Sequence, residues 1–180
     1  MTDIELLGEL IGDLARDLRP EIQQLAADEL LWQPAPEANA IGVTVWHIAR
    51  GLDFLAVRIL RGDAAEDELW HRNGWRERTG YDPHGIGYGG WGVLTGYTQE
   101  EVRAIPRLGA ADLVNYLDQA CGAVVVELGN FDSRSIRQTA TTVLDGRLTY
   151  FQWAKSFYKG FQAHVGEIVA IEGLMKQNRG

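Results

Sequence analysis

Apolar residues recur at helical spacing in four long segments of this 180-residue chain. A stripe that repeats every three or four residues requires one face of a helix to be buried against its neighbours. The segments cover about 3–25, 41–61, 110–129 and 150–176. The second is apolar nearly all round, which predicts a central position. We therefore predict an all-α fold, a four-helix bundle in a single domain over 1–180.

Local signals indicate where these helices end. Pro20 lacks a backbone donor, so we expect it to kink the first helix or to split off its last turn. Thr149 is expected to cap the fourth helix. Asp145-Gly146 predicts a turn, and a β-hairpin from residue 141 is an alternative there, although one isolated hairpin would be marginally stable.

The second and third helices are separated by a long crossover, residues 62–108, which is rich in glycine and tryptophan. Such a length allows the two helices to run parallel. We expect a structure-poor loop of the kind that often acts as a lid, with one short helix that Thr98 and Glu101 cap and that ends before Pro106. Residues 85–90 match the GxGxxG dinucleotide pattern, but they do not follow a strand or precede a helix, so a flexible loop is our interpretation.

Composition excludes several classes of function. A formal net charge of −8 argues against the basic surface that nucleic-acid phosphates require. No uncharged apolar run approaches the ~18 residues of a membrane span, and the acidic residues 1–5 lack the basic region of a signal peptide. The one cysteine, Cys121, is expected to be a small buried hydrophobe. We therefore expect a cytoplasmic protein that binds neither nucleic acid nor membrane.

Two histidines, His47 and His164, lie inside apolar helical segments. Burying an imidazole without a partner costs about 1–3 kcal/mol. Two interpretations stay open: a core histidine hydrogen-bonded to an acid such as Glu167, or a metal site between facing helices. His71 and His84 in the crossover are either solvated loop residues or residues with a role as ligands or in a lid.

Three blocks of sequence carry a resemblance to a known family. They are residues 34–53, which include Trp46-His47-Ile48-Ala49-Arg50, residues 96–102, and residues 164–174, which include His164-Val165-Gly166-Glu167-Ile168. In this order and spacing they resemble the second helix, the crossover and the fourth helix of the DinB-like superfamily. The resemblance is to the branch that includes mycothiol-dependent maleylpyruvate isomerases in particular.

The resemblance implies a bundle with one long crossover, a homodimer, and a divalent metal held by one ligand of the second helix and two of the fourth. His47 and His164 match two of these ligands. The third falls on Gly160, which has no side-chain donor, so the implied metal, Zn or Ni, is weakly bound or absent. His71 or His84 would be the substitutes for the missing ligand, and Glu167 is expected to orient a ligand or to move protons.

Two hypotheses for function follow. The first is a metal-dependent small-molecule enzyme, a thiol-dependent transferase or isomerase or a hydrolase, which works with a low-molecular-weight thiol. The second is a metal-free member that binds a small apolar ligand or acts through a dimer surface, and Gly160 favours it. In both, we expect a pocket near His47, Gly160 and His164 that the crossover roofs.

Overall fold

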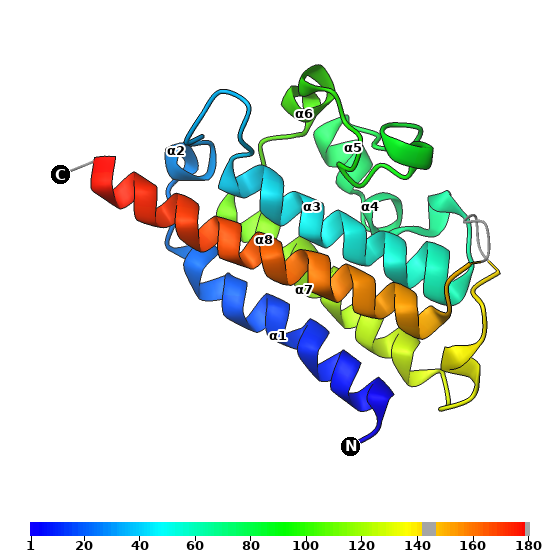
Figure 1. Ribbon diagram of the computed structural model, residues 1–180. Coiled ribbons are helices and arrows are strands. Elements are labelled where there is room, and N and C mark those ends of the chain that lie inside the picture. The colour runs from blue at the N-terminus through cyan, green and yellow to red at the C-terminus, as the bar shows by residue number, and fades with distance from the viewer. Residues whose placement is uncertain (142–146, 179–180) are drawn as a thin grey trace.

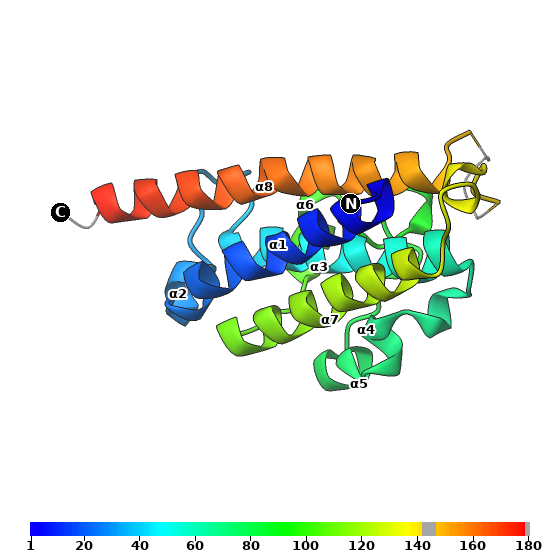
Figure 2. The same cartoon turned by 90° about the horizontal axis from the view of Figure 1, so that it is seen from below.

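The computed structural model describes residues 1–141 and 147–178, and its four long helices form a bundle (Figures 1 and 2). These helices are α1 (Asp3–Gln23), α3 (Ile41–Phe54), α7 (Ala110–Gly129) and α8 (Tyr150–Asn178). α1 and α3 each pack against both α7 and α8. The described residues contain no strand, only an isolated bridge between Thr139 and Thr149. The predicted all-α fold is confirmed.

The second predicted helix is the central element of the bundle. α3 continues as a π-helical segment, Leu55–Arg61, so the helical path ends at the predicted residue. Its side chains are almost all buried, in agreement with the apolar pattern all round the helix. α3 and α7 run in the same direction (Figure 1), which is the arrangement that the long crossover allows.

Most helix ends follow the local signals. Thr149 Oγ1 accepts a hydrogen bond from the backbone N–H of Gln152 at 3.2 Å and so caps α8. The predicted split of the first helix is wrong, because α1 continues through Pro20 as one helix. Pro20 is exposed and close to the end of the helix, where water can satisfy the carbonyl that it leaves without a donor. The predicted turn at Asp145-Gly146 and the alternative hairpin involve residues 142–146, which lie outside the described residues.

The crossover is more structured than predicted. It contains α4 (Leu69–Arg72), α5 (Trp75–Thr79) and α6 (Gln99–Ala104), with 3₁₀ turns at Ala65–Asp67 and Tyr88–Gly90. Trp70 and Trp75 are almost fully buried and pack against Tyr116 of α7. The ring centroid of Tyr116 lies 5.2 Å from that of Trp70 and 5.4 Å from that of Trp75. Burial of these large rings supplies the free energy that orders the segment. The predicted capping box of Thr98 and Glu101 is confirmed at the start of α6.

Further short elements complete the chain. α2 (Ala27–Leu30) lies between α1 and α3, and a 3₁₀ turn, Ser135–Arg137, lies between α7 and α8. Cys121 of α7 is buried as predicted, and burial raises the pKa of its thiol to about 12. In the described part of the chain, no helix combines the length and apolar character that a membrane crossing needs.

Candidate functional site

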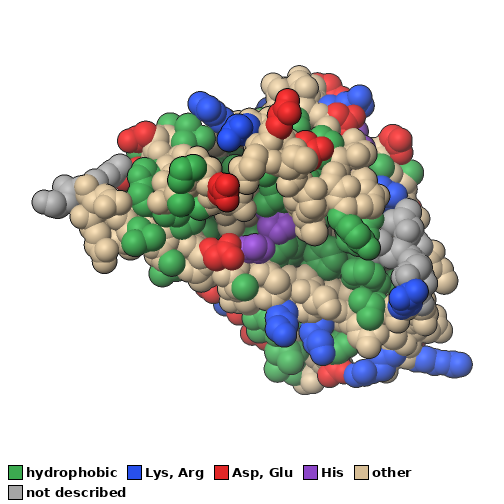
Figure 3. Space-filling model, turned by 45° about the horizontal axis from the view of Figure 1, so that its top comes forward, with side chains coloured by type: hydrophobic (Ala, Val, Ile, Leu, Met, Phe, Trp, Pro, Cys, Tyr) green, Lys and Arg blue, Asp and Glu red, His purple; other side chains and the backbone are tan. Residues whose placement is uncertain are grey.

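A cavity of about 310 Å³ lies between α3, α8 and the crossover, which is where the sequence analysis expects it. A space-filling view shows histidine side chains at a hollow in this face, beside hydrophobic side chains (Figure 3). The lining residues are His47 and Gly51 of α3, Trp91, Val93 and Thr95 of the crossover, and Ser156, Phe157, Gly160, Phe161 and His164 of α8.

The fold brings His47 and His164 side by side at this cavity. Their ring centroids are 4.8 Å apart and their planes are inclined by 80°. Phe161 lies edge-on to His47 at 5.8 Å. Nδ1 of His47 is buried and has no hydrogen-bond partner among the described residues. Burial, and next the neighbouring His164, lower the pKa of His47 to about 4, so its imidazole is neutral at physiological pH.

The carboxylate at this site, Glu167, is hydrogen-bonded to His164. Nδ1 of His164 lies 2.6 Å from Oε2 of Glu167, since residues three apart share one face of α8. Because a carboxylate only accepts hydrogen bonds, this contact places a ring proton on Nδ1, and in the neutral tautomer the lone pair is on Nε2. The side chain of His164 is 27% exposed, so water and ligands can reach the ring.

The residues at the cavity do not fit a three-ligand metal centre. His47 and His164 supply two imidazoles, and Glu167 is engaged by His164. Gly160 offers no donor at the third position, and a Cβ built there would meet nothing within 4 Å. A catalytic zinc site uses three protein ligands and one open position. The missing side chain leaves space in the cavity instead.

The structure does not bring His71 or His84 to this cavity. The two rings stack on each other in the crossover, with centroids 4.3 Å apart, beside Asp82. Nε2 of His84 is 2.6 Å from Oε2 of Glu68, which holds the ring away from His47 and His164. Burial, and next the neighbouring His84, lower the pKa of His71. Although burial opposes it, Arg50 holds the pKa of Glu68 below its ordinary value, with a further contribution from His84.

A buried charged network fixes the roof of the cavity, and the sequence analysis did not find it. Arg50, Asp53 and Glu68 are fully buried. Arg50 donates to Asp53 at 3.1 Å and to Glu68 at 3.0 Å, and its Nε donates to the carbonyl of Gly92 at 3.1 Å. Asp53 also accepts hydrogen bonds from the backbone N–H of Trp70 and from the hydroxyl of Tyr116. The one signal in the sequence is a charged pair, three residues apart, on a helix that is otherwise apolar.

The model of the DinB superfamily matches residues 12–154. The chain belongs to the DinB superfamily. The matched range includes α3, the crossover and α7, and it ends in the first turns of α8, before Gly160 and His164. The resemblance seen in the sequence is therefore confirmed at the level of the superfamily.

A solved structure shares the fold over nearly the whole chain. The crystal structure of a conserved protein from Enterococcus faecalis aligns with a TM-score of 0.78 and 19% sequence identity, and it covers 95% of each chain. Identity at this level shows the fold alone. No curated protein matches this DinB-superfamily chain.

Proposed function

We propose that this protein binds a small, predominantly apolar molecule in the His47–His164 cavity and catalyses a proton transfer on it, with His164 as the general base. One observation carries the proposal: His164, whose Nδ1 is hydrogen-bonded to Glu167, lines a cavity with aromatic walls. The side chains available for acid–base chemistry are the imidazoles of His47 and His164 and the carboxylate of Glu167.

The cavity suits a small apolar ligand. Its volume of about 310 Å³ lies at the lower end of the range for small-molecule sites. Trp91, Phe157 and Phe161 supply aromatic walls, and the absent side chain at Gly160 leaves space between them and His164. The net charge of −8 disfavours a polyanionic substrate.

The two histidines have different environments and therefore different roles. His164 accepts a proton on Nε2, and the Glu167 carboxylate stabilises the imidazolium that forms and orients the ring. His47 stays neutral, since its pKa is about 4, and it therefore adds no charge that would oppose protonation of His164. A positioned general base of this kind contributes roughly 10²- to 10⁴-fold to a rate.

Filling the cavity tests the binding half of the proposal. Gly160→Leu places a side chain into the open space, and Gly166→Leu is its matched control, because a Cβ at either position meets nothing within 4 Å and Gly166 does not line the cavity. With small aromatic fragments as probes in ligand-observed NMR, we expect binding to the wild type and to Gly166→Leu, and at least tenfold weaker binding to Gly160→Leu. Equal binding to all three would contradict the proposed site.

Substitution of the acid–base pair tests the catalytic half. A screen of small apolar esters, thioesters and ketones with an acidic C–H bond should reveal a turnover that falls about 10²-fold or more in His164→Gln. Glu167→Gln should retain binding and lower the rate to a smaller extent. A turnover that His164→Gln leaves unchanged would refute the assigned base.

A metal-dependent thiol transferase, isomerase or hydrolase is the second candidate. Two adjacent imidazoles, one of which is held by a carboxylate, favour it, because this is the pattern of metal-ligating histidines. A low-molecular-weight thiol is the co-substrate class that would add a third donor, since thiolates bind Zn²⁺ well. Elemental analysis of untagged protein decides: a Zn or Ni content that falls in both His47→Ala and His164→Ala would favour this candidate over the metal-free one.

A further inference from the structure

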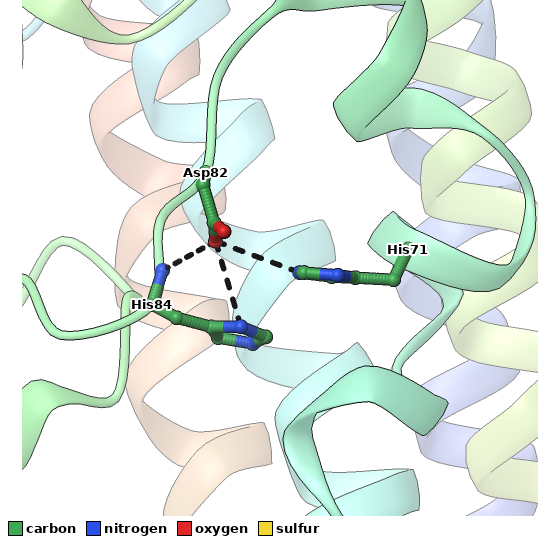
Figure 4. Close-up of side chains that lie close together, drawn as sticks. All are labelled: His71, Asp82 and His84. Atoms are coloured by element: carbon green, nitrogen blue, oxygen red, sulfur yellow. Dashed lines mark hydrogen bonds and ion pairs between the residues drawn. The ribbon is translucent and has the colours of Figure 1, made fainter.

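We propose that His71, Asp82 and His84 form a divalent transition-metal site, separate from the His47–His164 cavity, which ties α4 to the loop after α5. All three side chains come from the crossover and lie close together, with a ring nitrogen of each imidazole near the same carboxylate oxygen of Asp82 (Figure 4). Two imidazoles and a carboxylate are a donor set that Zn²⁺ accepts. The proposal is independent of the function assigned to the cavity.

The distances between the three donors fit a metal better than they fit hydrogen bonds. Nε2 of His71 lies 3.6 Å from Oδ1 of Asp82, and Nδ1 of His84 lies 3.5 Å from the same oxygen. Both separations are too long for good hydrogen bonds. In a tetrahedral zinc site with bonds of 2.0–2.1 Å, ligand atoms lie roughly 3.3 Å apart. One ligand atom from each of the three residues already lies within 4.8 Å of the others.

The hydrogen bond of His84 to Glu68 uses Nε2, so Nδ1 of His84 is the nitrogen available to a metal. The buried carboxylate of Glu68 lies 2.6 Å from Nε2 of His84 and requires the ring proton there. In the neutral ring the lone pair is then on Nδ1, which lies 3.5 Å from Oδ1 of Asp82, so a cation near both atoms could bind them. A metal-ligating histidine usually donates its other N–H to a carboxylate in this way.

The other two donors are also available. Nε2 of His71 is buried and makes no hydrogen bond to any described residue. Oδ2 of Asp82 forms an ion pair with Nε of Arg76 at 3.2 Å. Oδ1 accepts a hydrogen bond from the backbone N–H of His84 at 3.0 Å, which orients this oxygen. The Asp82 side chain is 37% exposed, which gives an ion access from solvent and leaves an open position for water.

A metal titration with matched variants tests the site. Full-length protein, freed of its tag and treated with EDTA, is titrated with Co²⁺, followed by its visible absorption, and with Zn²⁺ by calorimetry. We expect one equivalent to bind to the wild type and to the His47→Ala/His164→Ala double variant. His71→Ala and Asp82→Asn should each weaken binding at least 100-fold, and one equivalent of Zn²⁺ should raise the melting temperature of the wild type but not of His71→Ala.

Two results would overturn the proposal. One is binding of Zn²⁺ that His71→Ala and Asp82→Asn leave unchanged. The other is loss of the bound equivalent in the His47→Ala/His164→Ala variant, which would assign the ion to the cavity. Because His71 and Asp82 are not fully buried, circular dichroism of both variants should show the wild-type helix content, so that a loss of binding reports on the ligands.

Discussion

Acid should destabilise this protein through His47, and the structure gives the size of the effect. In the folded state the pKa of His47 is about 4, against an ordinary value of 6.5. The unfolded chain therefore binds a proton at His47 below about pH 6.5, whereas the folded chain resists that proton until about pH 4. The contribution of the neutral ring is fully present above pH 6.5 and is lost progressively as the pH falls toward 4.

The magnitude follows from the two pKa values. Each pKa unit corresponds to about 1.4 kcal/mol. A fall from 6.5 to about 4 therefore removes about 3 kcal/mol from the free energy of unfolding. This is a large fraction of the roughly 5–15 kcal/mol that stabilises a typical domain.

The measurement is a series of urea unfolding curves between pH 8 and pH 4, in EDTA, for the wild type and His47→Gln. The variant lacks the buried titrating group, so the difference between the two free energies of unfolding should change by about 3 kcal/mol across the series, in the direction that penalises the wild type in acid. His164→Gln should raise the pKa of His47 and reduce this change, since His164 contributes to the lowering. Parallel stability curves for the wild type and His47→Gln would refute the reasoning.

Three further predictions concern stability and reactivity. Gly160→Ala should raise the free energy of unfolding by roughly 0.5–1 kcal/mol, and the melting temperature by about 2–4 °C, because its Cβ meets nothing within 4 Å in a helix interior; a decrease on thermal unfolding would contradict this. Asp53→Ala should lower the free energy of unfolding by about 3–5 kcal/mol, because it leaves the buried Arg50 without one of its partners; urea titration measures it, and a loss below about 1 kcal/mol would count against the network. Cys121 should not react with Ellman's reagent at pH 8 in the native state and should react fully in urea, since burial raises its pKa to about 12; a rapid native reaction would disprove its burial.

The bundle was predictable because its helices follow from local sequence signals: the periodic spacing of apolar residues and the capping residues at helix ends. The third long helix begins and ends at the predicted residues, Ala110 and Gly129, and the capping box at Thr98 depends on residues three apart. Pro20 shows the limit of such rules, because the cost of a lost donor depends on whether water reaches the freed carbonyl. Exposure is a property of the whole fold.

The candidate site was predictable in part. Helical spacing and the family resemblance placed His47, Gly160 and His164 near one another, and all three line the cavity. The partner of His164 was within reach, since Glu167 lies three residues away on the same helix. The positions of Glu68, Asp82 and His84 were not predictable, because they depend on how the crossover folds around Arg50.

The contacts of Arg50 argue against the crossover as an opening lid. Its guanidinium holds the carbonyls of Trp91 and Gly92 over the cavity and binds Glu68, which in turn binds His84. Lifting the crossover as a lid would break these contacts and remove Glu68 from the buried guanidinium of Arg50, which would keep only Asp53 of its two carboxylate partners, so such a motion is costly. The α8 side of the cavity has no such constraint, because Ser156 and Gly160 are exposed. We therefore expect the proposed ligand to enter past α8, where Gly160 lacks a side chain.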